Sequence, residues 1–391
     1  MKKIVSLILL ISILLTFTLP SIAENSRKSG AETIANSGLD LSGDAFSVYL
    51  CEAKTGKVLY SDNEFEKALP ASVTKVMTLL LVMEALDKGR FSLDDKVSIS
   101  AKAASMGGSQ VFLEEGERIT VEELIKSAVI ASGNDASVAL AELVAGSESS
   151  FVKLMNQRAN ELGLKNTNFE NSTGLDDTTT NHYTCAADIA KMSRELINHE
   201  LILQYSSLWQ DTIRNGEFTL TNTNRLVRYY EGCNGLKTGS TDKAGYCISA
   251  TAKRGNMQLI AVVMGAGSRD ERNTIARELL DYGFANYSLY ENDESYVEDA
   301  SVLGGVSDKV SLYSLPFSSV IDKTSLNNVE LVYEIPETVV APIEKGQILG
   351  KVIYKVAGEQ VGYSDIVAGD DVARINYGEI LVRMLKRIIV G

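Results

Sequence analysis

A serine and a lysine stand three residues apart at the start of the apolar segment ALPASVTKVMTLLLVMEAL, residues 69–87. The segment reads as a buried helix, and positions i and i+3 share a helical face, so Ser72 and Lys75 are expected side by side. A serine hydroxyl is a poor nucleophile until a base takes its proton, and an amine withdrawn from water has a lowered pKa that suits this task. The pair therefore predicts nucleophilic serine chemistry with a lysine base. The helix N-terminus adds free N–H groups that can stabilise an oxyanion.

Two further motifs follow the pair along the chain. The S-G-N motif at 132–134 separates two helical patterns, and the K-T-G motif at 237–239 lies on a predicted strand beside a glycine-rich turn. Each motif alone is weak, because S-x-x-K recurs at 150–153 and 240–243 and K-T-G recurs at 54–56. Only the first series gives S-x-x-K, S-x-N and K-T-G in the order found in penicillin-binding proteins and class A β-lactamases. The order of the motifs therefore favours one combined site.

On these motifs the chain resembles the low-molecular-weight penicillin-binding proteins that are D-alanyl-D-alanine carboxypeptidases, the S11 serine peptidases. The resemblance covers nearly the whole mature sequence and includes ASVTKVMT, MGGSQVFLEEGE, ASGNDASVALAE, STGLDD, GLKTGSTDKAGYC and LLDYGF. Glycine inside S-G-N is typical of these carboxypeptidases, whereas β-lactamases usually have aspartate there. The resemblance implies removal of the terminal D-alanine from peptidoglycan stem peptides, acylation by β-lactam antibiotics as inhibitors, and no cofactor.

The resemblance also implies a catalytic role for each matching residue. Ser72 attacks the carbonyl between the two D-alanines, and Lys75 is the general base. Ser132 passes a proton to the departing amine, and Asn134 holds the peptide side of the substrate. Lys237 adds positive potential, which would also keep Lys75 deprotonated.

Further residues are implied in substrate binding. Thr238 lies near the terminal carboxylate of the substrate, and Gly239 lets the substrate lie close along the strand. The backbone N–H groups of the nucleophile and of Ser240 form the oxyanion hole. Arg272 best matches the family's carboxylate-binding arginine, with Arg269 as its competitor.

Three other interpretations remain to be weighed. A class A β-lactamase needs a glutamate base in an E-x-x-L-N loop, and Glu170 followed by Asn171 does not fit that pattern. A Ser-His-Asp hydrolase is poorly supported by the only two histidines, His182 and His199, without a G-x-S-x-G motif. A non-catalytic wall-associated or sporulation scaffold of the same fold is the third alternative. One departure from the family is given no role here: some members have an arginine in the region of the TNTNRL segment, where this chain has Thr223 and a later Arg225.

The predicted fold class is α+β. Strand patterns occur at both ends of residues 40–287 with helical patterns between them, which, with the resemblance, gives a penicillin-binding/β-lactamase-like domain with helices on the faces of an antiparallel sheet. Short strand patterns broken by Gly, Pro and Asn then predict a small β-sandwich at 288–371. An amphipathic helix is expected at 372–391.

Both ends of the chain point to export and a membrane surface. Residues 1–23 have the basic start, apolar run and small cleavage residues of a signal peptide, and 24–39 read as a linker. In the tail, Glu379, Arg383, Lys386 and Arg387 share one helical face and apolar residues cover the rest, which suits a membrane interface. These features predict a protein anchored by its tail to the outer face of the cytoplasmic membrane, with packing of the tail on the β domain as the alternative.

Composition excludes one class of partner. The chain has 391 residues, 45% of them hydrophobic, and its net charge of −13 opposes binding to nucleic acid. The four cysteines (Cys51, Cys185, Cys233 and Cys247) are widely spaced and fit no metal template. Free, partly buried thiols are expected, with disulfides as the alternative.

Overall fold

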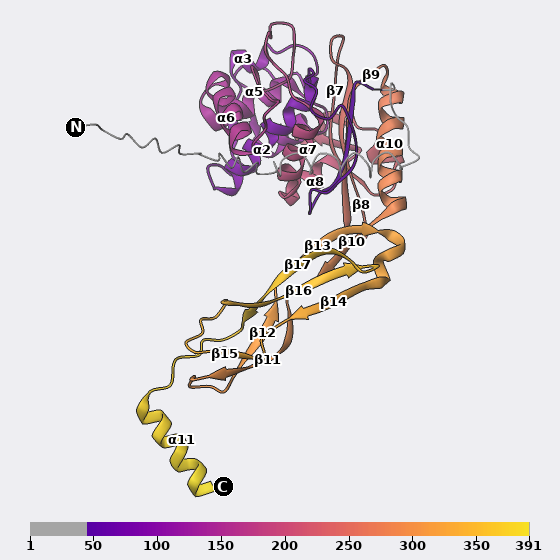
Figure 1. The fold of residues 1–391 in the computed structure, drawn as a ribbon. Helices are drawn as coiled ribbons and strands as arrows, with labels where there is room; N and C mark the ends of the chain where they lie inside the picture. Colours follow the sequence, from indigo (N-terminus) through magenta and orange to yellow (C-terminus); the bar gives the residue numbers. More distant parts are fainter. Residues whose placement is uncertain (1–44, 391) are drawn as a thin grey trace, which may run out of the picture. The chain divides into compact units, whose positions relative to one another are not determined.

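A computed structural model describes residues 45–390 (Figure 1). The predicted signal peptide and linker lie outside the described residues. The first region is organised around one antiparallel sheet with the strand order β2-β1-β9-β8-β7. Its strands are β1 (Ser47–Glu52), β2 (Val58–Asp62), β7 (Cys233–Thr241), β8 (Gly245–Arg254) and β9 (Met257–Ala266). The predicted pairing of strands from both ends of the region is confirmed.

Helices cover both faces of this sheet. Helix α10 packs on β8 and β9, while α7 packs on β1 and β9 and α8 packs on β7, on the side where most helices gather (Figure 1). Helix α10 (Arg269–Asn286) follows β9. Between β2 and β7 the chain forms η1 (Ala71–Thr74), α2 (Lys75–Asp87), β3 (Lys96–Ser98), α3 (Ala101–Ala104), β4 (Arg118–Thr120), α4 (Val121–Val129), α5 (Asn134–Ala145), α6 (Glu148–Glu161), α7 (Ala186–Ile197), α8 (Glu200–Ser206), β5 (Gln210–Ile213), η2 (Arg214–Gly216), β6 (Phe218–Thr221) and α9 (Leu226–Tyr229).

Helix α2 is the centre of the helical layer. Every residue from Lys75 to Met83 is buried, because the sequence is apolar around the whole helix and leaves no face for water. The α-helix starts one turn later than predicted: Ser72 lies in the 3₁₀ turn η1, and the α-helical stretch begins at Lys75. The positive φ of 47° at Ala71 sets the tight entry of the chain into this turn.

The start of α4 is defined by side-chain capping. Thr120 caps the helix by accepting the N–H of Glu123, and the Glu123 carboxylate accepts the N–H of Thr120 in return. This capping box fixes where α4 begins, and the short segment between α4 and α5 holds the S-G-N turn.

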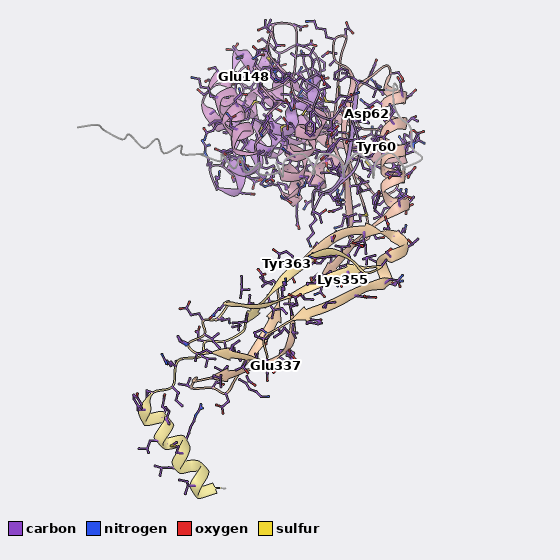
Figure 2. The ribbon with its side chains drawn as sticks, viewed as in Figure 1. Tyr60, Asp62, Glu148, Glu337, Lys355 and Tyr363 are labelled. Atoms are coloured by element: carbon purple, nitrogen blue, oxygen red, sulfur yellow. The ribbon has the colours of Figure 1, made fainter. Side chains whose placement is uncertain are left out.

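The second region is all-β, as predicted. A six-stranded sheet has the order β14-β16-β17-β12-β11-β15, and β10 pairs with β13 in a separate two-stranded sheet. Tyr354 is fully buried in this region and stacks on Phe317, with ring centroids 3.9 Å apart. In Figure 2, the labelled residues Lys355 and Tyr363 mark strands β16 and β17. The elements are β10 (Tyr287–Asn292), β11 (Ser295–Leu303), β12 (Lys309–Ser314), β13 (Phe317–Asp322), η3 (Lys323–Asn328), β14 (Val329–Glu334), β15 (Thr338–Val340), β16 (Ile348–Val356) and β17 (Glu359–Ala368).

The chain ends in the predicted helix, α11 (Tyr377–Val390). Its Arg383 donates a hydrogen bond to the Asp308 carboxylate at 2.7 Å and another to the carbonyl of Val306. Apolar side chains of the helix remain exposed, including Leu381 and Ile388. Within residues 45–390, no helix combines the length and the hydropathy needed to cross a bilayer.

Candidate active site

Ser72 and Lys75 are in direct contact, as their spacing predicts. The Lys75 Nζ lies 3.0 Å from the Ser72 Oγ, 2.6 Å from the Asn134 Oδ1 and 2.9 Å from the carbonyl oxygen of Thr173. Lys75 has no exposed surface, whereas Ser72 is partly exposed on the wall of a cleft. The hydroxyl can therefore meet a substrate while the amine behind it stays out of water.

The surroundings of Lys75 favour a neutral amine. Burial lowers the pKa of Lys75 well below its ordinary value, the positive charge of Lys237 lowers it further, and Asp135 opposes the shift. A neutral amine has two N–H donors, which satisfy Asn134 Oδ1 and Thr173 O. Its lone pair then faces the hydrogen of the Ser72 hydroxyl, which is the arrangement that general-base catalysis requires.

Ser132 belongs to a second hydroxyl–amine pair. The Lys237 Nζ donates to the Ser132 Oγ at 2.8 Å and to the carbonyl of Thr238 at 2.8 Å. Burial, followed by the charge of Arg272, lowers the pKa of Lys237 to about 7. Ser132 has a left-handed φ of 64°, an uncommon conformation for a residue other than glycine, asparagine or aspartate. That local backbone sets the position of its hydroxyl in the cleft.

Asn134 links the base to the opposite wall of the cleft. Its Oδ1 accepts from Lys75, its Nδ2 donates to the carbonyl of Gly107 at 2.7 Å, and its backbone N–H donates to the carbonyl of Ser109 at 2.7 Å. One N–H of the side-chain amide remains for a substrate.

Gly239 makes room for the nucleophile. A Cβ atom at position 239 would lie 2.7 Å from the backbone nitrogen of Ser72 and 2.8 Å from that of Val73, too close for any side chain. Strand β7 therefore approaches the Ser72 turn backbone to backbone, and the exposed Ser240 follows at the cleft edge. Only glycine permits this approach.

A cleft of about 450 Å³ extends from Ser72 past Thr238 to a group of guanidinium groups. Arg272 is only 3% exposed, donates to the Asn273 Oδ1 and to the carbonyl of Cys247, and has its pKa lowered to about 10 by burial and by Arg269. Both Arg269 and Arg272 line the cleft. A concentration of positive charge at this end suits a carboxylate-ended ligand.

Some residues of the cleft were given no role from the sequence. Arg225 and Trp209 line it, and Thr223 lines it while its hydroxyl accepts a hydrogen bond of 2.7 Å from Thr238. Ser109 lines it as well. The cationic end therefore has a third guanidinium. In the sequence, Arg225 stands out only as part of the TNTNRL segment. Which residues of that segment face the cleft is decided by the tertiary fold.

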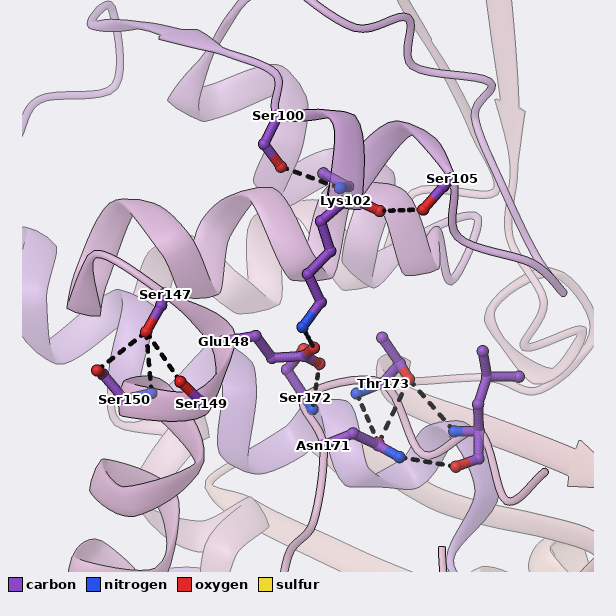
Figure 3. A network of polar contacts seen from close by, with 12 residues as sticks. Ser100, Lys102, Ser105, Ser147, Glu148, Ser149, Ser150, Asn171, Ser172 and Thr173 are labelled. Carbon is purple, nitrogen blue, oxygen red and sulfur yellow. Dashed lines mark hydrogen bonds and ion pairs between the residues drawn. The ribbon is translucent and has the colours of Figure 1, made fainter. Parts of the chain in front are cut away.

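A short loop carries the carbonyl that binds Lys75 (Figure 3). The Asn171 Oδ1 accepts the N–H of Thr173 and that of Gly174, and the Glu148 carboxylate accepts the N–H and hydroxyl of Ser172 at 3.1 and 2.7 Å. Lys102, on α3, completes the network with an ion pair of 2.6 Å to Glu148. Burial alone would raise the pKa of Glu148, but the hydrogen bonds from Lys102 and Ser172 outweigh it and lower the pKa.

The same loop packs directly on the turn that holds the nucleophile. Gly174 has a φ of 84°, and a Cβ atom there would overlap the carbonyl oxygen of Ala71 at 1.8 Å and approach the Thr74 Oγ1 at 2.7 Å. The loop therefore packs against the Ser72 turn so closely that no methyl group fits between them.

Glu148→Ala should weaken both the fold and the site. The change leaves the buried N–H and hydroxyl of Ser172 without their acceptor, which lowers the free energy of unfolding by about 2 kcal/mol. It also loosens the Thr173 carbonyl, so acylation by penicillin should slow about tenfold. Denaturant unfolding and stopped-flow acylation measure the two effects. Glu115→Ala, at an exposed glutamate, is the matched control, and equal rates in both variants would contradict the prediction.

Within the described residues, neither the histidine rings nor the cysteine thiols form a hydrogen bond with the side chains of Ser72, Lys75, Ser132 or Lys237. His182 accepts the N–H of Glu170 on one ring nitrogen and contacts the Thr74 hydroxyl with the other, and burial lowers its pKa to about 4. His199 binds Asp87. All four cysteines are buried and free, as expected.

Comparison with known sequences identifies the relatives of this chain. A family model described as D-alanyl-D-alanine carboxypeptidase, Peptidase S11, matches residues 34–268, and one described as the C-terminal domain of penicillin-binding protein 5 matches 284–374. The D-alanyl-D-alanine carboxypeptidase DacF of Bacillus subtilis (strain 168) is 43% identical, with 98% of each chain covered.

Similar solved structures are also penicillin-binding proteins. Penicillin-binding protein 5 from Haemophilus influenzae is 32% identical with a TM-score of 0.76, and the match covers 85% of this chain and 98% of that one. Penicillin-binding protein D2 from Listeria monocytogenes, in its ampicillin-bound form, is 31% identical with a TM-score of 0.58, covering 63% of this chain and 99% of that one. The predicted fold class is confirmed. The chain belongs to the S11 serine peptidase family of D-alanyl-D-alanine carboxypeptidases.

Proposed function

We propose that the chain removes the terminal D-alanine from peptidoglycan stem pentapeptides through an acyl-enzyme on Ser72. The observation that carries the proposal is the buried Lys75 amine, 3.0 Å from the Ser72 hydroxyl at the wall of a cleft that ends in arginines. The direct test is release of D-alanine from a peptide ending in Lys-D-Ala-D-Ala. An enzyme that releases none while it is correctly folded would support the scaffold alternative instead.

Acylation follows from the positions of the side chains. The Ser72 Oγ attacks the carbonyl between the two D-alanines as its proton passes to Lys75. The N–H groups of Ser72 and Ser240 hold the oxyanion, since Gly239 brings the strand against the nucleophile. The C–N bond then breaks, and the departing amine takes its proton through Ser132. Water later hydrolyses the ester and frees a tetrapeptide that can no longer donate in cross-linking.

Substrate binding uses the two ends of the cleft. Thr238 and the Arg272 guanidinium bind the terminal carboxylate, with Arg269 and Arg225 adding positive charge nearby. Lys237 strengthens this positive field and holds the Ser132 hydroxyl. The free N–H of Asn134 binds the peptide on the other side of the scissile bond.

Acylation should depend on pH through Lys75. The base acts only when neutral, so the rate falls as the pH drops through the pKa of Lys75, and this loss lies well below pH 10.5 because burial lowers that pKa. Lys237→Met removes a nearby positive charge, so the acidic limb should move to higher pH. Penicillin acylation rates measured against pH give both profiles, and identical acidic limbs in the two proteins would contradict the coupling.

A β-lactamase is the less favoured function. Glu170, in the loop near Lys75, accepts the N–H groups of Thr180 and Asn181, at 2.8 Å each. Among the described residues it is a hydrogen-bond partner of neither Ser72 nor Lys75. Without a second base the acyl-enzyme should persist, so β-lactams inhibit rather than turn over. Rapid, continuous hydrolysis of nitrocefin would reverse this ranking.

The location and the domain limits are part of the proposal. Residues 1–23 direct export, 24–39 form a tether, 40–287 are catalytic, 288–371 are a small β domain, and 372–391 bind the outer surface of the cytoplasmic membrane. The exposed apolar side chains of α11, such as Leu381 and Ile388, support this placement. Co-sedimentation with anionic vesicles of the mature chain, but not of a form ending at residue 374, tests the anchor.

A further inference from the structure

A second cleft continues the active-site cleft beyond Ser240. It has a volume of about 820 Å³, shares Ser240 with the first, and is lined by the turn from Thr241 to Tyr246 together with Lys67 and Phe46. A third hollow of about 280 Å³ shares Lys67 and Lys243 with the second. Neighbouring hollows share lining residues, so they follow one another from the arginines, past Ser240, to these two lysines.

The direction of the substrate follows from the proposed function, on which this inference rests. If the terminal carboxylate lies among the arginines and the scissile carbonyl lies at Ser72, the rest of the stem has an exit across Ser240, where the first cleft adjoins the second. An extended peptide rises about 3.3 Å per residue, so the third stem residue and its side chain reach the second cleft. Whatever lines that cleft therefore meets the stem ahead of its D-Ala-D-Ala end.

Two ammonium groups dominate this region. Lys67 and Lys243 are exposed, and within residues 45–390 neither has a carboxylate within 4 Å, although the chain has 51 acidic residues against 38 basic ones. Each is fixed by one weaker contact: the Lys67 Nζ lies 4.3 Å from the centre of the Tyr183 ring, and the Lys243 Nζ donates to the carbonyl of Asp176 at 3.2 Å. Both keep free N–H donors for an anion.

Two acidic residues, Asp176 and Asp242, line the same hollows, and neither forms an ion pair with Lys67 or Lys243. The Asp176 carboxylate accepts the hydroxyl of Thr241 at 2.6 Å and is held at the turn, and Asp242 is exposed on the same turn. A ligand group with a carboxylate thus meets two ammonium groups. A neighbouring amine on the same ligand would find Asp242 close by.

We propose that Lys67 and Lys243 form a carboxylate subsite that recognises a free carboxylate of the stem peptide on the acyl side of the scissile bond. Two positions in a stem supply this chemistry. One is the side chain of a third residue that is a diamino diacid rather than lysine, and the other is the free α-carboxylate of a γ-linked glutamate at the second position.

The test uses peptides that differ by one carboxylate. The first pair is N-acetyl-lysyl-D-Ala-D-Ala and N-acetyl-diaminopimelyl-D-Ala-D-Ala, and the second is γ-D-glutamyl-lysyl-D-Ala-D-Ala with the α-carboxylate free or amidated. In the wild-type enzyme, kcat/KM should be about tenfold higher for the carboxylate-bearing member of at least one pair, since each exposed charge pair contributes a few-fold. The pair that responds identifies the source of the carboxylate.

The variant Lys67→Gln/Lys243→Gln should bring that ratio close to one, and raised salt should reduce it in the wild type because exposed charges are screened. Lys165→Gln, at an exposed lysine away from the clefts, should keep the full ratio. Equal kcat/KM within both pairs in the wild type, or a ratio that survives in the double variant, would overturn the subsite while leaving the carboxypeptidase function intact. Failure to release D-alanine from all four peptides would instead overturn the proposed function, and the subsite with it.

Discussion

Ser72→Ala should abolish both D-alanine release and covalent labelling by penicillin. The substitution removes the oxygen that forms the acyl-enzyme, so the loss of kcat should be about 10⁴-fold or more. The fold should survive, because the side chain is small and partly exposed at the cleft wall. Mass spectrometry of the intact protein after incubation with penicillin measures the labelling, and a peptide map of the wild type locates the adduct.

The chain contains its own control for this experiment. Ser150 and Lys153 repeat the S-x-x-K spacing on α6, where the Ser150 hydroxyl accepts a hydrogen bond from Ser147 and Lys153 is exposed (the Ser150 contact is drawn in Figure 3). Ser150→Ala should keep full labelling. A penicillin adduct that persists in Ser72→Ala would rule out Ser72 as the nucleophile.

Lys75→Met should slow acylation by about 10³- to 10⁴-fold. Methionine fills similar space but cannot accept the proton of the Ser72 hydroxyl, and it leaves the Asn134 Oδ1 and the Thr173 carbonyl without their donor. The residual rate should also lose the acidic limb of its pH profile, which a general loss of packing would not remove. Stopped-flow acylation across the pH range measures both effects.

Lys153→Met is the matched control for this variant, because it removes the lysine of the same motif at an exposed position. It should acylate at the wild-type rate. An acidic limb that stays in Lys75→Met would mean that another group is the base.

The sequence was sufficient to predict the contact that matters most. The i, i+3 spacing places Ser72 against Lys75, and the motif order brings residues 132–134 and 237–239 to the same cleft. Alternation of strand patterns with turns predicted the second region as all-β. These successes depend on local periodicity and on side chains with distinctive chemistry.

Other parts of the site had no such signal. The carbonyl of Thr173 and that of Gly107 bind Lys75 and Asn134 through backbone atoms, which every residue carries. The ion pair of Lys102 with Glu148 joins positions far apart in the chain, so only the tertiary fold reveals it. The 3₁₀ turn at Ser72 was also missed, since a composition that suits a helix does not specify how its first turn is wound.

The close fit between Gly174 and the Ala71 carbonyl bears on how antibiotic resistance could evolve here. Escape from a penicilloyl ester requires a new base and a water molecule beside the blocked serine. At position 174 even a methyl group collides with the backbone, and the loop's own glutamate is committed to neighbouring N–H groups. A side chain at position 174 therefore cannot supply that base without a shift of the backbone, so a variant that hydrolyses the ester would need its new base at another position.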